Sequence, residues 1–172
     1  MKSVLRTQDT IIIDATEQRI QRPKDKEEQK ACYSGKKTNT IKETKDRVIR
    51  YLSSSYQGRN HDYRLLKEEF PPDENCFANI NVKVDHGYLG IAKDYICKSI
   101  SIPYKNTKNN PLTDEQKLSN KTMASERIIV EYSIGGMKRY RILSDRLRLH
   151  DFDLYNVILG VWVGLWNYFL LG

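Results

Sequence analysis

The stretch TIIIDATEQRIQRPKDK, residues 10–26, places an acid directly after three isoleucines and then becomes polar and basic. A short continuous run of apolar, β-branched residues predicts a buried strand over residues 10–14. Asp14 ends that strand. It is either an ordinary strand-end residue or a carboxylate that the strand holds at the edge of a sheet for chemistry. The rest of the sequence must decide between these two interpretations.

The composition predicts one domain with a polyanionic partner. The chain has 172 residues, of which 39% are hydrophobic, enough for a real core. The formal net charge is +7, which favours a partner such as nucleic acid. Three widely spaced cysteines, Cys32, Cys76 and Cys97, indicate neither a disulfide framework nor a zinc site. No secretory signal begins the chain, so we expect a reducing cytosol.

Strand and helix patterns along the chain predict a mixed α/β class. Strands are expected at the end of the basic connection 20–42 and over residues 47–56, 76–85 and 100–105. A short helix is expected over 63–70 with Asp62 as its N-cap, and a long one over 113–143 that begins with a Thr113–Gln116 capping box. Gly135 and Gly136 inside the long helix indicate a kink or close packing against another element.

The C-terminal segment, residues 154–172, contains no charged residue. Its length is close to the roughly 20 apolar residues that a membrane-spanning helix needs, and basic residues precede it. Against a membrane helix, Asn156 and Asn167 interrupt the apolar run. A terminal helix buried between a sheet and its neighbours has a similar sequence. The sequence leaves both interpretations open.

A second acid, Asp85, also ends a predicted strand and precedes a turn. If the two strands are neighbours, Asp14 and Asp85 converge at one sheet edge. Glu131 lies in the long predicted helix on one face with Arg127 and Lys138. Three convergent carboxylates stay ionised only with cations between them, and hard divalent ions fit such ligands. Two such ions can cleave a phosphodiester, whose phosphates the two basic residues would bind.

Each of these residues also has an ordinary structural explanation. Asp14 alone would be a turn residue, and Arg127 with Glu131 would be a common surface ion pair. The functional interpretation therefore depends on the set as a whole.

In order, these segments resemble the DDE superfamily endonucleases, the DDE-class insertion-sequence transposases, and within them the Harbinger-like branch. The resemblance runs from about residue 10 to the end of the chain. It is carried by IIIDATEQRIQRPKD with YSGKK, YQGRNHD, VDHGYLG, SIPYKN with LTDEQKLSN, SERIIVEYSIGGMKRYRIL and DFDLYNVILGVWVGLWNYFL.

The resemblance implies a single RNase H-like catalytic domain over residues 1–172, with a mixed sheet flanked by helices and a buried C-terminal helix. It implies that Asp14 is the first catalytic and metal-binding acid and Glu131 the third. Asp62 and Asp85 both fall in blocks of the family. Because an RNase H-like sheet places its second acid at the end of the fourth strand, we expect Asp85, with Asp62 as the alternative.

The activity that the resemblance implies is metal-dependent DNA cleavage and strand transfer at the ends of a mobile element, with two Mg²⁺ or Mn²⁺ ions. The expected partner is DNA, and the expected state is a homo-oligomer when active. The location would be the cytoplasm, with the nucleoid when DNA is bound. Candidate DNA contacts are Lys36, Lys37, Arg127 and Lys138.

Several positions depart from the family. Ala15 replaces a glycine, Ala124 replaces a tyrosine, and residues 38–52 are short for the expected second strand and hairpin. Only 13 residues precede Asp14, where the family has a helix-turn-helix region. We therefore expect a catalytic-domain fragment or an inactive copy. A non-catalytic, basic DNA-binding remnant and a basic protein anchored by a membrane helix stay as alternatives.

Overall fold

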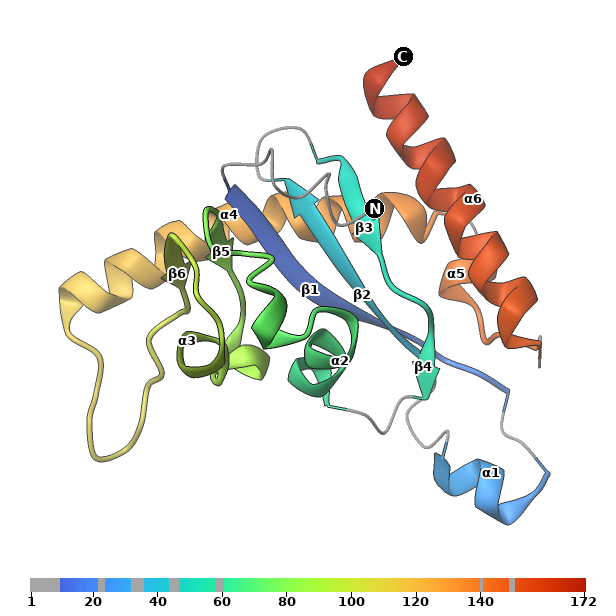
Figure 1. Ribbon diagram of the computed structural model, residues 1–172, viewed down its shortest axis with the longest axis horizontal. Helices are drawn as coiled ribbons and strands as arrows, with labels where there is room; N and C mark the ends of the chain where they lie inside the picture. The colour runs from blue at the N-terminus through green and yellow to red at the C-terminus, as the bar shows by residue number, and fades with distance from the viewer. Residues whose placement is uncertain are drawn as a thin grey trace.

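A mixed β-sheet forms the centre of the protein (Figure 1). The computed structural model describes residues 10–21, 24–31, 36–43, 47–57, 61–139, 141–148 and 151–172. The strands are β1 (Thr10–Gln18), β2 (Lys36–Glu43), β3 (Ile49–Leu52), β4 (Tyr56–Gln57), β5 (Asn81–Lys83) and β6 (Ser99–Ser101). The sheet order is β3-β2-β1-β5-β6, and β4 also pairs with β2. Strands β5 and β6 continue the sheet parallel to β1, whereas β2 is antiparallel to β1 and to β3.

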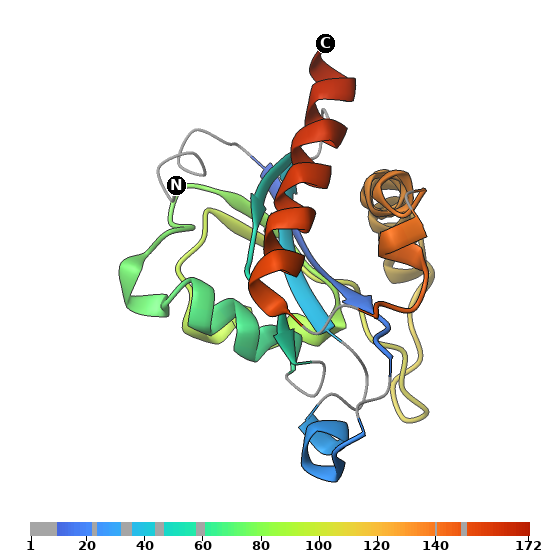
Figure 2. The same ribbon diagram turned by 90° about the vertical axis from the view of Figure 1, so that its right-hand side faces the viewer.

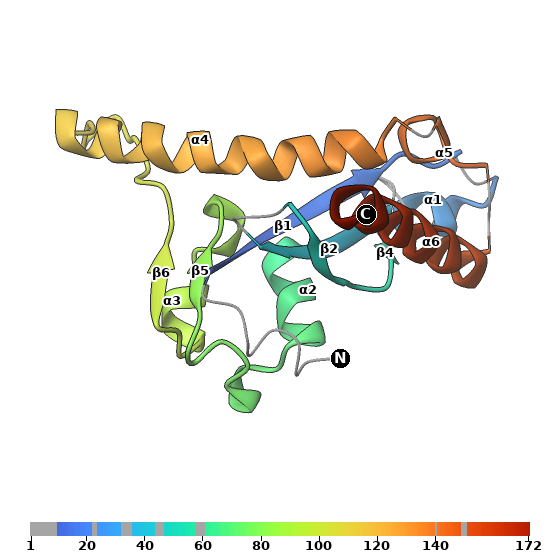
Figure 3. The same ribbon diagram turned by 90° about the horizontal axis from the view of Figure 1, so that it is seen from above.

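Helices lie on both faces of the sheet. They are α1 (Lys26–Ala31), α2 (Asp62–Glu69), α3 (Ile91–Asp94), α4 (Asp114–Met137), α5 (Arg141–Ser144) and α6 (Phe152–Leu171), with short 3₁₀ helices η2 (Pro72–Glu74) and η3 (His86–Tyr88). Helix α4 crosses one face of the sheet and α2 lies on the opposite face (Figure 3). Helix α6 lies along strand β3, and its C-terminal end projects beyond the sheet (Figure 2).

Strand β1 divides its side chains between these two faces, because successive residues of a strand point in opposite directions. Ile11 and Ile13 are buried in the main core with residues of the α2 face, among them Leu66 and Phe77. Asp14, which has the opposite orientation to Ile13, faces α4. The apolar run therefore closes the core and presents an acid on the other side of the same strand.

The strand predicted over residues 10–14 is confirmed but continues to Gln18, so Asp14 lies within β1 and not at its end. The continuation exists because β2 pairs with β1 over residues 11–18. The expected shortening of the second strand is wrong, since β2 has eight residues. Of the first three strands, β3 is the shortest, with four residues.

Other predicted elements are shorter than expected. The strand predicted over 47–56 divides into β3 and β4, and the strand predicted over 76–85 shrinks to β5. The strand predicted over 100–105 is β6, which begins one residue earlier and ends at Ser101, four residues before the predicted end. The long helix is confirmed with its capping box, but α4 ends at Met137 and the short α5 follows.

The N-cap of α2 is His61, and the prediction of Asp62 is wrong. The Nδ1 atom of His61 accepts a hydrogen bond from the backbone N–H of Tyr63 at 3.4 Å. Because the histidine already serves this end of the helix, the carboxylate of Asp62 is not needed as a cap.

Helix α6 covers the edge strand β3 with its polar side chains. The side-chain amide of Asn167 accepts from the N–H of Ile49 and donates to its carbonyl oxygen, both at 2.9 Å. Asn156 accepts from the N–H of Ser55 at 2.9 Å. Asn167 thus pairs with both backbone hydrogen-bonding groups of Ile49, as a neighbouring strand would. The two asparagines that interrupt the apolar run therefore fasten α6 to the molecule.

The expectation of a buried C-terminal helix is wrong for most of α6. Tyr155 and Leu159 are buried, whereas the side opposite to them is exposed. In the described part of the chain, α6 is the one helix long and apolar enough to cross a membrane, judged by length and composition alone.

Helices α4 and α6 meet at Gly136. A methyl group added there would lie 2.1 Å from Cζ3 of Trp166, so glycine is the residue that lets the two helices approach. Nothing in the described residues lies within 4 Å of a methyl group added at Gly135. The close packing predicted from the glycine pair is therefore confirmed at Gly136. The carbonyl of Arg47 joins the same contact, since it accepts from Ser133 of α4 and Trp166 of α6.

Candidate active site

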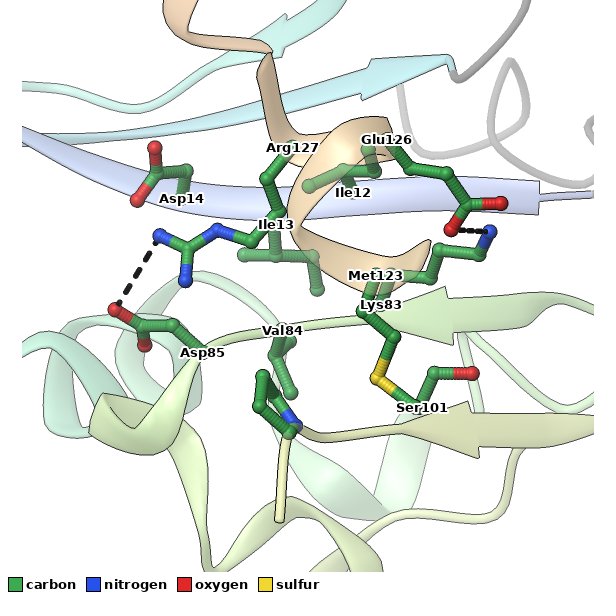
Figure 4. Close-up of a pocket in the computed structure, with 11 residues that line it drawn as sticks. Ile12, Ile13, Asp14, Lys83, Val84, Asp85, Ser101, Met123, Glu126 and Arg127 are labelled. Carbon is green, nitrogen blue, oxygen red and sulfur yellow. Dashed lines mark hydrogen bonds and ion pairs between the residues drawn. The ribbon is translucent and has the colours of Figure 1, made fainter. Parts of the chain in front are cut away.

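A pocket lies between α4 and the parallel part of the sheet (Figure 4). Strands β1 and β5 supply its floor, and one turn of α4 supplies its roof. The lining residues are Ile12, Ile13, Asp14, Lys83, Val84, Asp85, Ser101, Pro103, Met123, Glu126 and Arg127. Two of the four acids expected from the sequence, Asp14 and Asp85, are among them.

The register of the sheet explains why Asp14 and Asp85 meet. Strands β1 and β5 are parallel neighbours, and Ile12 is paired with Lys83. Asp14 and Asp85 each lie two residues further along, so they occupy matching positions on the same face. Adjacent strands are about 4.8 Å apart, which brings carboxylates at such positions close together. The predicted convergence of these two acids is therefore seen in the structure.

The orientation of Asp85 is fixed by the backbone that follows it. Asp85 is the N-cap of η3, and its Oδ1 accepts a hydrogen bond from the N–H of Gly87 at 2.8 Å. Its Oδ2 is 4.0 Å from Nη2 of Arg127. The guanidinium group of Arg127 extends from α4 into the space between Asp14 and Asp85 (Figure 4). The side chains of the ion pair are about one third exposed, 36% for Arg127 and 32% for Asp85, so solvent reaches it.

Asp62 lies close to the same group but does not line the pocket. A methyl group added at Gly87 would lie 2.9 Å from Oδ1 of Asp85 and 3.5 Å from Oδ2 of Asp62. Gly87 therefore separates the two candidates for the second acid. Only Asp85 shares the pocket with Asp14, which favours it on geometry.

Tyr88 is buried behind the three aspartates. Burial raises the pKa of its hydroxyl well above the ordinary value, and the negative charges of Asp62, Asp14 and Asp85 raise it further. The tyrosine thus stays neutral beside a concentration of negative charge. The three acids are distant in sequence, and folding brings their negative charges together around Tyr88.

Glu131 is not part of this pocket. It is exposed on α4, four residues beyond Arg127, which is about one helical turn of 5.4 Å further along the axis. The expected convergence of three carboxylates is thus observed for two of them. No group of three or more His, Cys, Asp or Glu side chains in the described residues is arranged to hold a metal ion.

The basic residues predicted to contact DNA do not all lie at the pocket. Arg127 lines the pocket, whereas Lys138 is exposed at the C-cap of α4. The side chains of Lys36 and Lys37 lie outside the part of the chain whose side chains the structure describes.

The pocket contains an ion pair that the sequence did not reveal. Nζ of Lys83 is 2.6 Å from Oε2 of Glu126, and this pair joins β5 to α4. The partners are 43 residues apart in sequence, so no local pattern connects them. The one available signal was that Glu126 precedes Arg127 and that Lys83 precedes Asp85 by two residues on the same strand face.

The side-chain atoms that line the pocket determine whether a divalent metal ion fits there. Asp14 and Asp85 offer carboxylate oxygens, the ligands that Mg²⁺ and Mn²⁺ prefer. Among the residues that the structure describes, neither histidine nor cysteine lines the pocket. The guanidinium between the carboxylates shows that this position favours a positive charge. Two ligands of the predicted set therefore fit a hard divalent cation.

The fold and the pocket define a mixed α/β protein whose central strands present paired acids beneath a long helix. Comparison with known proteins places it more closely. The chain belongs to the DDE superfamily endonucleases, whose family model matches residues 13–167.

A relative agrees with this placement, and a solved structure has a similar fold. The chain is 34% identical over 166 residues to the probable transposase for insertion sequence element IS702 of Microchaete diplosiphon. That match covers 92% of this chain and 56% of the relative, so the chain spans little more than half of the relative's length. The fold is similar to a piggyBac transposase in a synaptic complex with hairpin DNA, with a TM-score of 0.52 and 9% identity. The similarity covers 94% of this chain and 46% of that one.

Proposed function

We propose that the protein is the catalytic domain of a transposase, a metal-dependent endonuclease and strand transferase that acts on the DNA ends of a mobile element. The observation that carries this proposal is the meeting of Asp14 and Asp85 at matching positions of adjacent parallel strands, under Arg127. Membership of the DDE superfamily endonucleases supports it. A net charge of +7 supports DNA as the partner.

The finer family assignment is also part of the proposal. We assign the chain to the Harbinger-like branch and its fold to the RNase H-like type. The support for the fold is a sheet in which antiparallel β1 and β2 are continued by the parallel strands β5 and β6. Asp85, the proposed second acid, follows β5, which pairs with β1 and is the fourth strand of the chain if the two-residue β4 is left out. We expect the protein in the cytoplasm, associated with the nucleoid when it binds DNA.

The proposed chemistry gives each pocket residue a role. Asp14 and Asp85 would hold divalent cations, with Glu131 as the third ligand that the resemblance implies. When bound, two such cations supply an activated water and stabilise the leaving oxygen of the phosphodiester. Arg127 would exchange its contact with Asp85 for a substrate phosphate, because guanidinium binds phosphate oxygens well. No side-chain nucleophile is required.

Nicking of supercoiled plasmid DNA in the presence of Mn²⁺ or Mg²⁺ tests the proposal. We expect Asp14→Asn, Asp85→Asn and Glu131→Gln to lower the nicking rate at least about 100-fold, as loss of a catalytic metal ligand does. Asp62→Asn and Glu126→Gln are matched controls, because Asp62 lies beside the pocket, Glu126 lines it, and neither acid is assigned to the metal. We expect both to keep most of the activity.

The results divide the alternatives clearly. If Asp62→Asn abolishes nicking and Asp85→Asn does not, the second acid is Asp62. If Glu126→Gln abolishes it and Glu131→Gln does not, the helix residue has been assigned wrongly. A folded wild-type protein that neither binds Mn²⁺ nor cuts DNA would refute the catalytic proposal.

A second candidate function is DNA binding without catalysis, and the exposed position of Glu131 outside the pocket favours it. This candidate predicts DNA binding that weakens steeply with salt and does not change in Asp14→Asn or Glu131→Gln. Binding measurements on the same variants as those used for nicking would identify it.

A further inference from the structure

Helix α6 leaves one apolar side without a cover in the described structure. Six residues form this stripe, at intervals of three or four residues: Leu154, Val157, Val161, Leu165, Tyr168 and Leu171. Their exposed fractions run from 45% for Leu165 to 75% for Tyr168. Spacing of three and four places them on one side of a helix. We call this surface the α6 stripe.

The opposite side of α6 is already in use. Tyr155 and Leu159 are buried against the molecule, Trp166 contacts α4, and Asn167 pairs with strand β3. The α6 stripe is therefore a second apolar side on a helix whose first side already binds the sheet. A helix at the surface of a protein normally has polar residues on its outer side.

We infer that the α6 stripe is a dimerisation surface and that its partner is the same stripe of a second copy of this chain. The first support is its area. An aromatic side chain presents roughly 150–250 Å², and with the aliphatic residues the exposed apolar area is on the order of 500–600 Å² per copy. Two copies would bury roughly 1,100 Å², which passes the area of about 1,000 Å² expected of a specific interface.

The second support for a second copy is that the α6 stripe is uncharged while the rest of the chain is basic. The whole chain carries a net charge of +7, so two copies repel one another over most of their surfaces. No charged residue occurs from Leu154 to Gly172. An uncharged stripe with coiled-coil spacing is complementary to itself, and a two-fold axis brings apolar side chains of both copies together.

The same observations argue against DNA and a membrane as the occupant. DNA phosphates are bound by lysine and arginine, and the α6 stripe has neither. Crossing a bilayer would require α6 to leave the sheet. Asn156 and Asn167 would lose their hydrogen bonds to Ser55 and Ile49, and polar amides would enter hydrocarbon.

Sedimentation velocity of the whole chain over a wide range of concentration tests the inference. We expect the wild type to form dimers and the double variant Val157→Glu with Val161→Glu to stay monomeric, with a dimer Kd raised at least about 100-fold. Leu118→Glu is the matched control, because Leu118 is 67% exposed but lies on α4, outside the stripe. It should dimerise like the wild type. Circular dichroism would check that each variant is folded.

A cross-link gives an independent readout if the charged variants fail to fold. Val161 lies near the middle of α6 and is 55% exposed, so it meets its own copy in a parallel or an antiparallel pair centred on the helix. Oxidation should join Val161→Cys into a covalent dimer, whereas Leu118→Cys should give no more dimer than the wild type.

Three outcomes would overturn the inference. The first is a wild type that stays monomeric at every concentration. The second is a dimer that the charged double variant preserves. The third is a monomer that floats with anionic phospholipid vesicles through the α6 stripe, which would identify a bilayer as the occupant. None of these results depends on nicking activity, so the test is separate from that of the proposed function.

Discussion

The two faces of strand β1 have different chemistry, although they belong to the same few residues. On the α2 face, Ile11 and Ile13 are almost fully buried among aromatic and aliphatic side chains. On the α4 face, Asp14 meets Asp85 and Arg127 in a pocket that solvent reaches. The alternation of a strand therefore separates stability from function within one short element. Substitutions on the two faces should have different consequences.

The largest effect on folding is expected on the α2 face. Phe77 is fully buried, and its ring lies 5.4 Å from that of Phe70 and 5.5 Å from that of Tyr95 between centroids. We expect Phe77→Ala to lower the free energy of unfolding by about 3–5 kcal/mol, because it removes a large core side chain and leaves a cavity. Urea unfolding measures this change.

Asp14→Asn is the matched substitution on the other face. It should change the free energy of unfolding by less than about 1 kcal/mol while it removes metal binding, because Asp14 belongs to the solvated pocket. If Asp14→Asn destabilises the protein as much as Phe77→Ala does, the two faces are not separated in the way we describe.

An intermediate effect is expected where α6 packs on α4, on the same side of the sheet as the pocket. Gly136→Ala should lower the free energy of unfolding by about 1–3 kcal/mol, because the new methyl group would collide with the ring of Trp166. Gly135→Ala is the adjacent control and should stabilise the protein by up to about 1 kcal/mol, since nothing described lies near its added methyl group. Equal effects at the two glycines, measured by thermal unfolding, would refute the close helix contact.

A smaller effect is expected for metal binding when the guanidinium leaves the pocket. Arg127→Gln should tighten Mn²⁺ binding a few-fold, because Arg127 competes with a cation for Asp85. The effect stays modest because an ion pair that is one third exposed contributes only about 0.2–1 kcal/mol. Titration calorimetry of the unliganded protein measures the affinity.

Arg64→Gln is the control for this measurement. Arg64 pairs with Glu68 on α2, at 3.0 Å, and that pair is not part of the pocket. Its removal should leave the affinity for Mn²⁺ unchanged. Weaker binding in Arg127→Gln would instead mean that the arginine holds Asp85 in place.

The sequence predicted the elements that depend on local pattern. Three isoleucines before an acid are enough to predict a buried strand and a placed carboxylate, and Thr113 with Gln116 is enough to predict where α4 begins. The resemblance added the order of the acids along the chain.

The contacts between distant residues could not be predicted in the same way. The meeting of Asp14 with Asp85 depends on the register of β1 against β5, which no segment of sequence contains. The ion pair between Lys83 and Glu126 has the same origin. Apolar composition also did not indicate which side of α6 the sheet would cover, and the buried helix was expected from the resemblance.

The smallest effect is expected at the surface of the α2 face, where Asp94 of α3 accepts a hydrogen bond from the Tyr63 hydroxyl at 2.7 Å. This bond holds the pKa of Asp94 below its ordinary value; desolvation opposes that effect, and Lys67 adds to it. A carboxyl whose pKa is lowered on folding stabilises the protein above its unfolded pKa of about 3.9, and this contribution is lost as the pH falls further. Asp94→Asn should therefore reduce stability slightly at pH 6 and approach the wild type near pH 3. Urea midpoints of both proteins over this range measure the difference, and a gap that widens toward acid would contradict the assignment.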